Sequence, residues 1–215
     1  MFLPTRSCPR IWTLVLLLLC ALAIAEEGEW SLEKDADGIK VYTREVSGWS
    51  VRQFRGVVEI DARIESLLAL LDDNASCSRW IHNCITSELL ERTDAYRKYS
   101  YVQTKAPWPI KKRDTVLFTT TTVTDGHVEI IGIAMPDYRP RERKFVRIPK
   151  QEVRWELKPM ENGYVQIIFE SKFDPGGSVP DWAVNRTLID TPFNTLRNMR
   201  QLVQEPKYRD TELSP

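Results

Sequence analysis

The chain has 215 residues, with 30 basic and 30 acidic side chains, so its formal net charge is zero. This balance gives no electrostatic signal for nucleic acid, and we expect no nucleic-acid partner. The length suffices for one domain with a well-buried core. Seven tryptophans are many for this length, and they indicate a large aromatic interior or a large apolar pocket.

The first 25 residues have the pattern of a secretory signal peptide. Arg6 and Arg10 supply positive charge, residues 11–25 are nearly all apolar, and Ala23 and Ala25 place small residues at a cleavage site. An uncleaved anchor is the alternative, but about 15 apolar residues are short for a span of about 20. We therefore expect cleavage after Ala25, export, and one domain over residues 26–215.

Two cysteines, Cys77 and Cys84, follow the signal peptide. An even number of cysteines in an exported chain favours a disulfide over two buried free thiols. On one continuous helix their Cα atoms would be about 10.5 Å apart, whereas a disulfide needs about 5.5 Å. A bridge therefore requires a helix end or a turn between them. His82 and His127 form no ligand cluster with further cysteines, so we expect no metal site.

Alternating apolar and polar residues predict strands through most of residues 30–173. Clean alternation indicates an antiparallel sheet with one apolar and one solvated face. Two short helices interrupt the strands, the first with Asp61 as its expected N-cap and the second with Trp80 pointing inward. In chain order we expect strands at 30–34, 39–45 and 51–60, helices near 64–71 and 78–82, and strands at 87–92, 95–103, 115–124, 127–135, 151–158 and 164–174.

The stretch from Asp174 to Val203 organises this chain. It begins as a turn at Pro175, and large apolar residues then recur at spacings of three, four or seven, which predicts a long amphipathic helix. Ser178 is the expected N-cap, and Pro180 fits the first turn. A long helix with such a face needs a curved sheet to bury it. The apolar stripe consists of Trp182, Ile189, Phe193, Leu196, Met199 and Val203.

Pro192 lies within this predicted helix and allows two interpretations. Proline removes a backbone hydrogen bond, so it either kinks one movable helix or begins a second helix that Thr191 caps.

Three motifs, in this order, resemble the steroidogenic-acute-regulatory-related lipid-transfer (START) family. Trp80 follows the short helices, Pro107-Trp108-Pro109 precedes Arg113-Asp114 at a strand start, and Gly176-Gly177-Ser178-Val179-Pro180-Asp181-Trp182 opens the last helix with Asn185. The resemblance covers residues 30–203.

The resemblance implies an α+β helix-grip fold, in which a curved antiparallel sheet wraps around a long C-terminal helix, with two short helices, and encloses an apolar cavity. It also implies non-covalent binding or transfer of a lipid, a sterol or another hydrophobic small molecule, without a cofactor. We expect the protein to be a monomer. A stand-alone domain of this family with a signal peptide looks bacterial, which favours the periplasm.

We expect the apolar sheet face and the last helix to line the cavity. Ordinary core packing is the alternative for each residue. Along the strand 115–124, either one set of residues or the alternate set faces inward, and the resemblance favours the first. The first set is Leu117, Thr119 and Thr121, and the second is Val116 and Phe118. Some sterol-binding relatives carry a basic residue at the position of Thr119, so the resemblance does not extend to sterol specificity. The expected lipid-binding residues are Trp108, Arg113, Leu117, Thr119, Ile130, Trp155, Ile167, Phe169, Trp182, Asn185, Ile189 and Phe193.

Arg113 and Asp114 are neighbours on one strand, so their side chains point to opposite faces of the sheet. They cannot both face the cavity, and we expect a structural ion pair with another partner for at least one of them. Asn185 has two interpretations: it binds a ligand head group, or it holds a loop carbonyl.

The loop from Ala106 to Lys112 is the expected door of the cavity. Its prolines keep it out of the sheet, and Trp108 beside lysines suits transient contact with a membrane surface. In relatives the corresponding loop is a mobile lid near the helix. The alternative is a rigid loop with Trp108 buried in the core.

Three functions remain open on the sequence alone. The first is a non-catalytic lipid carrier or sensor, and the second is a cavity enzyme of the polyketide cyclase type on the same fold. The chain has no nucleophile motif and no glycine-rich phosphate loop, which weighs against an enzyme. The third is an interaction module that uses the basic run from Arg139 to Lys150, although a solvated loop also explains that run.

Overall fold

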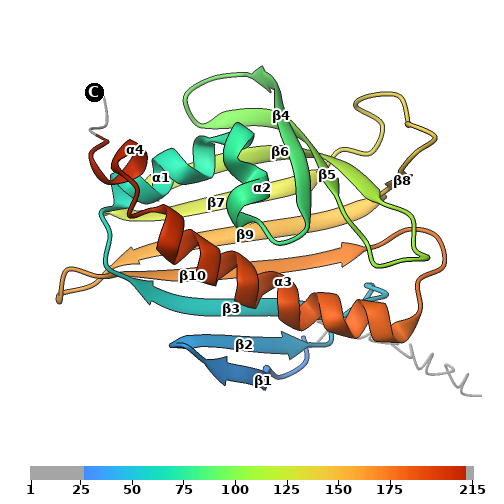
Figure 1. The fold of residues 1–215 in the computed structure, drawn as a ribbon, viewed down its shortest axis with the longest axis horizontal. Coiled ribbons are helices and arrows are strands. Elements are labelled where there is room, and N and C mark those ends of the chain that lie inside the picture. The colour runs from blue at the N-terminus through green and yellow to red at the C-terminus, as the bar shows by residue number, and fades with distance from the viewer. Residues whose placement is uncertain (1–26, 212–215) are drawn as a thin grey trace, which may run out of the picture.

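The computed structural model describes residues 27–211, and the predicted signal peptide lies outside them. One curved sheet has the strand order β1-β2-β3-β10-β9-β7-β6-β5-β4, with β8 paired to β6 (Figure 1). Only the β6–β8 pair is parallel, so the predicted curved antiparallel sheet is confirmed. The strands are β1 Ser31–Ala36, β2 Ile39–Arg44, β3 Gln53–Ile60, β4 Cys84–Arg92, β5 Arg97–Thr104, β6 Arg113–Thr124, β7 His127–Ala134, β8 Val146–Arg147, β9 Lys150–Pro159 and β10 Val165–Asp174.

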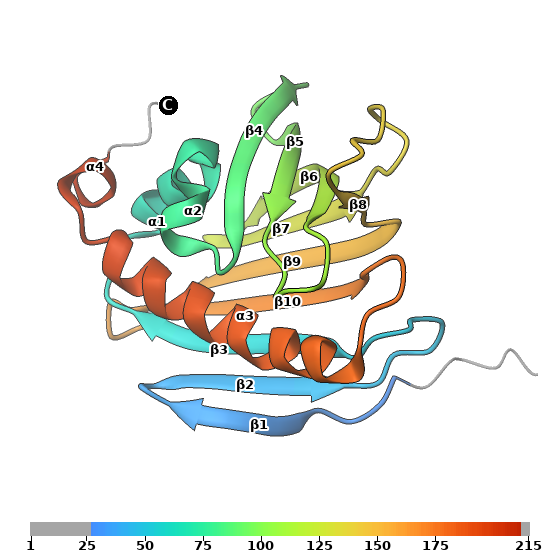
Figure 2. The same ribbon diagram turned by 45° about the vertical axis from the view of Figure 1, so that its right-hand side comes forward.

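The long helix α3, Asp181–Leu202, lies across one face of the sheet and packs on β2 and β3 (Figure 2). The other helices are α1 Ile64–Asp72, the 3-10 turn η1 Asn74–Ser76, α2 Cys77–Trp80 and α4 Pro206–Arg209. Within residues 27–211, no helix has the length and hydropathy to cross a membrane.

The helix ends differ from the predicted ones. Helix α1 begins after Arg63 rather than Asp61, because the Arg63 carbonyl accepts the first helical hydrogen bond, from the N–H of Leu67. Helix α3 begins after Pro180 rather than Ser178, because the Pro180 carbonyl accepts hydrogen bonds from the next turn. It continues through Pro192 without interruption, so the second helix capped by Thr191 does not exist.

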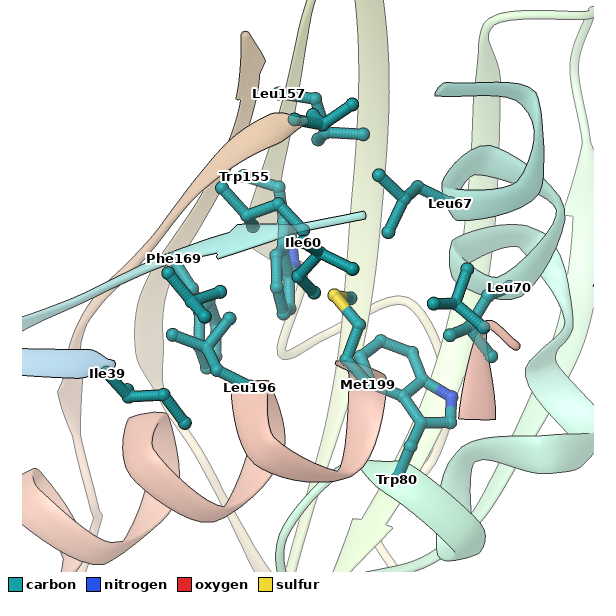
Figure 3. Packing of buried hydrophobic residues seen from close by; sticks show 14 of the residues in the cluster. Ile39, Ile60, Leu67, Leu70, Trp80, Trp155, Leu157, Phe169, Leu196 and Met199 are labelled. Atoms are coloured by element: carbon teal, nitrogen blue, oxygen red, sulfur yellow. The ribbon is translucent and has the colours of Figure 1, made fainter. Parts of the chain in front are cut away.

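The core lies between the C-terminal half of α3 and the sheet (Figure 3). Leu196 and Met199 are fully buried and point toward Phe169, Trp155 and Ile60. Gly56 on β3 permits this close approach. A Cβ atom there would lie 2.7 Å from Cδ1 of Leu196 and 2.9 Å from Cβ of Pro192. The helix therefore rests directly on the backbone of the sheet.

The two cysteines are joined by a disulfide, with 5.9 Å between their Cα atoms. Helix α2 starts at Cys77 and ends at Trp80, and a turn leads to Cys84 at the start of β4. The helix end between the cysteines supplies the short separation that a continuous helix would prevent.

Candidate ligand-binding cavity

A cavity of about 260 Å³ lies between the N-terminal half of α3, the sheet, and the loop between β5 and β6. Most side chains that line it are apolar. The lining residues are Phe54, Ile81, His82, Asn83, Val102, Thr104, Lys105, Ala106, Pro107, Ile110, Arg113, Thr115, Leu117, Ile148, Gln151, Val153, Trp155, Phe169, Ser171, Phe173, Pro175, Val179, Ala183, Val184, Thr187 and Thr191.

Aromatic side chains of the sheet form the floor of the cavity. Trp155 on β9 and Phe169 on β10 are paired across the two strands, and their rings stack with centroids 3.9 Å apart. Phe54 on β3 meets Phe169 edge-on, with centroids 5.1 Å apart. This apolar floor follows from the alternation of β9 and β10, which places every second residue on the helix side of the sheet.

Helix α3 closes the cavity with small side chains. Ala183, Thr187 and Thr191 recur every four residues, so they lie on one face of the helix, and Val184 lies beside them. The hydroxyl of Thr187 donates a hydrogen bond to the Ala183 carbonyl, which satisfies its polar group within the helix. Small residues on this face leave space that larger ones would fill.

The loop between β5 and β6 forms the remaining wall through Lys105, Ala106, Pro107 and Ile110. Trp108 points away from the cavity, and 90% of its surface is exposed. The interpretation that buries Trp108 in the core is therefore wrong. The loop and α3 line the same cavity, as the predicted door requires.

Arg113 lies in the cavity wall and is 8% exposed. Its guanidinium donates hydrogen bonds to the carbonyls of Lys111, Pro175 and Gly176. These bonds connect the loop on one side of the cavity with the turn before α3 on the other. Burial lowers the pKa of Arg113 below its usual range.

Asp114 points to the opposite face of the sheet, as strand alternation requires. Both of its oxygens accept hydrogen bonds from Arg147, at 3.0 and 2.9 Å, and both side chains are 1% exposed. The Tyr101 hydroxyl donates to the same carboxylate at 2.8 Å, and burial, with Asp114 adding to it, raises the pKa of Tyr101 to about 12. Arg147 thus leaves the predicted solvated basic run and belongs to a structural ion pair.

His82 and Gln151 add polar atoms to the cavity wall. Burial lowers the pKa of His82, so the neutral imidazole is favoured at neutral pH. Its backbone N–H donates to the Thr195 hydroxyl on α3 at 3.0 Å, which fixes this segment against the helix. The side-chain oxygen of Gln151 is buried, with no hydrogen-bond partner among the described residues.

No aspartate or glutamate lines the cavity among residues 27–211 with described side chains. Glu170 is buried but lies on the opposite face of the sheet from Phe169, where Arg55 and Gln53 donate to it. The same residues contain no group of three or more possible metal ligands.

Four of the expected lipid-binding residues line the cavity, and most of the others lie elsewhere. Arg113, Leu117, Trp155 and Phe169 are in its wall, and the side chain of Trp182 lies outside the description. The remaining seven are not lining residues: Trp108 and Asn185 are exposed, Thr119 and Ile189 are half-buried, and Ile130, Ile167 and Phe193 belong to the core.

The correction at α3 has a physical reason. Large residues such as Phe193 fill space, so they identify the packed half of the helix rather than the cavity. The cavity-facing row of Ala183, Thr187 and Thr191 is visible in the sequence as small residues four apart. The sequence analysis missed that signal. It predicted the loop as a door but named only Trp108 from it as a lipid-binding residue, and Trp108 does not line the cavity.

One long helix closing a curved sheet over a ligand-sized cavity defines the helix-grip class of domains. A profile described as START domain matches residues 12–209. The chain therefore belongs to the START domain family.

Similar proteins agree with this assignment. The uncharacterised Pseudomonas aeruginosa protein PA1579 is 36% identical over 184 residues, which cover 85% of this chain and 90% of that protein. The crystal structure of a STAR-related lipid transfer protein fragment from Xanthomonas axonopodis is 38% identical, with a TM-score of 0.75, and the match covers 82% of this chain and 99% of that one. A Streptomyces aromatase/cyclase, Zhui, shares the fold at 9% identity and a TM-score of 0.54, over 72% of this chain and 94% of that one.

Proposed function

We propose that this protein is an exported, non-catalytic carrier that holds one hydrophobic ligand in the cavity beneath α3. The observation that carries the proposal is a wall in which aromatic side chains such as Trp155 and Phe169 surround a space of about 260 Å³. Each square ångström of apolar ligand surface removed from water contributes about 25 cal/mol, so such a space favours an insoluble ligand. The lipid-transfer relative supports the same role.

We propose further that the loop between β5 and β6 meets the membrane when ligand is exchanged. Trp108 is almost fully exposed between the exposed side chains of Lys105, Lys111 and Lys112. An indole ring suits the head-group region, and each lysine near an anionic surface contributes about 1 kcal/mol of attraction. Since the same loop lines the cavity, contact there would open a path for the ligand.

Lipid extraction followed by mass spectrometry of the purified protein tests ligand binding. We expect one hydrophobic molecule per chain, whereas an empty protein that also rejects fluorescent fatty acids and sterols would contradict the proposal. Transfer between anionic vesicles should slow in the variant Trp108→Ala and remain unchanged in Tyr96→Ala. Tyr96 is an exposed aromatic residue that does not line the cavity, which makes it a matched control.

A cyclase-type enzyme is the second candidate, and His82 is the observation that favours it. His82 is a lining residue, and burial lowers its pKa, as suits a general base. The charge of Asp190 on α3 acts on His82 in the opposite direction, but no described carboxylate lines the cavity. If the bound molecule leaves the protein chemically unchanged, and remains so with His82→Gln, the carrier is supported; a His82-dependent product would support the enzyme.

A further inference from the structure

Several polar groups of the cavity, among them its two cationic side chains, gather at one end. Arg113 on β6 pairs with Thr104 on β5, Lys105 follows directly, and the Arg113 guanidinium reaches the carbonyl of Pro175. Gln151, near the start of β9, lies opposite Phe173 on β10, two residues before Pro175. The stacked Trp155 and Phe169 lie four residues further along these strands, about 13 Å away. The cavity is therefore amphipathic along its length.

The charge at the polar end has one sign. Arg113 and Lys105 are its cations, and no described carboxylate lines the cavity. Three N–H groups of Arg113 donate to backbone carbonyls, which leaves two of the five in a guanidinium without a partner among the described residues. The lowered pKa of Arg113 has burial as its cause, with no described acid to offset it. On the other face, Arg147 has Asp114 as its counter-ion.

Gln151 is a second polar residue at this end with an unused hydrogen-bonding atom. Its buried amide oxygen has no hydrogen-bond partner among the described residues, although buried polar atoms are normally paired. The oxygen and nitrogen of a side-chain amide exchange places by a flip, so Gln151 can offer a donor to an anion or an acceptor to a hydroxyl.

We propose that the ligand is an amphiphile with one anionic head group, a carboxylate or a phosphate, bound at Arg113. Its apolar part lies against Trp155 and Phe169. The cavity volume of about 260 Å³ falls just below the range of about 300–1,000 Å³ typical of small-molecule sites, so it favours a single-chain ligand over a two-chain phospholipid. This inference rests on the proposed carrier function and specifies its ligand class.

Paired probes that differ only in head-group charge test the inference. Delipidated full-length protein is titrated with palmitate and its methyl ester, and with palmitoyl lysophosphatidate and palmitoylglycerol. Cholesterol serves as a neutral ring ligand. We expect each anion to bind about tenfold or more tightly than its neutral partner, because a charge-assisted hydrogen bond exceeds a neutral one. The two pairs decide between a carboxylate and a phosphate head group.

Variants locate the anion. Both Lys105 and Lys112 are exposed, but only Lys105 is a lining residue. Lys105→Ala therefore removes a cation at the cavity wall, and Lys112→Ala removes one from the same loop outside it. We expect only Lys105→Ala to reduce the preference for the anion, by about threefold. Arg113→Met should abolish the preference for the anion. Because Arg113 also holds backbone carbonyls, circular dichroism must first show that this variant is folded.

The outcomes separate the two proposals. If neither member of any pair binds, and cholesterol also fails, the carrier function itself is wrong. If charged and neutral partners bind equally, or the neutral ones bind more tightly, the carrier stands and the anionic ligand is overturned. Equal effects of Lys105→Ala and Lys112→Ala would place the anion outside the cavity and likewise overturn the inference.

Discussion

The two halves of α3 face the same sheet, but one packs against it and the other covers a cavity. The C-terminal half packs on β2 and β3, and its side chains Leu196 and Met199 are fully buried. The N-terminal half presents Ala183 and Thr187, and a cavity lies beneath it. The difference shows that side-chain size, rather than hydrophobicity alone, decides where a helix-grip domain packs and where it binds.

Truncating Leu196 should have the largest effect. Leu196→Ala removes a fully buried side chain, so the free energy of unfolding should fall by about 2–5 kcal/mol. Val184→Ala, on the cavity half of the same helix, should cost less than half as much, because Val184 is only partly buried and lines the cavity. Urea denaturation of both variants measures the difference, and equal losses would remove the distinction between the halves.

The second-largest loss of stability should come from adding one methyl group beneath the packed half of α3. Gly56→Ala places a Cβ atom within 2.7 Å of Leu196, so we expect unfolding to become easier by about 1–3 kcal/mol. Gly132→Ala is the matched control, since its new Cβ atom would meet nothing closer than 3.6 Å. Thermal unfolding followed by circular dichroism checks both, and an unchanged melting temperature in Gly56→Ala would show that the helix is not seated as described.

Filling the cavity half should change binding instead of stability. Thr187→Leu extends into the cavity, so ligand affinity should weaken about tenfold because of steric overlap, while the free energy of unfolding stays nearly constant. Asn185→Leu adds the same side chain on the exposed side and should leave affinity unchanged. Titration with a fluorescent fatty acid reports the result; unaltered binding by Thr187→Leu would move the ligand elsewhere.

The smallest effect concerns the pH dependence of stability. Burial lowers the pKa of His82 in the folded state, so the unfolded chain takes up the proton first as the pH falls below about 6.5. His82 should therefore contribute stability above that pH and lose it below. When the pH is lowered from about 7.5 to about 5, the melting temperature of His82→Gln should fall less than that of the wild type. His127→Gln, which alters an exposed residue, should behave like the wild type.

The sequence predicted the strands well because alternation in segments such as β9 and β10 directly reports which side of a sheet each residue faces. For the same reason it placed Trp155 and Phe169 in the cavity wall, whereas Ile130 and Ile167, expected beside them, belong to the core. The prediction of the cavity-lining residues on α3 was wrong, because an apolar stripe identifies packed residues and does not indicate empty space beside them. The predicted helix starts were also wrong. At α3 the first helical hydrogen bonds are made by the Pro180 carbonyl, and the possible cap Ser178 lies two residues before it. Strand β8 and helix α4 are too short to show periodicity.

Gly56 has a consequence for motion. Pro192 and Leu196 lie directly on the β3 backbone at Gly56, so this part of α3 is held closely against the sheet. Pro192 has no N–H to donate to the preceding turn, so α3 lacks one backbone hydrogen bond just before the residues that contact Gly56. If the protein opens to admit ligand, the movement of α3 should therefore be confined to the segment before Pro192, which covers the cavity. Amide hydrogen exchange would then be fast in that segment and slowed by ligand, while amides after Leu196 exchange only when the whole domain unfolds.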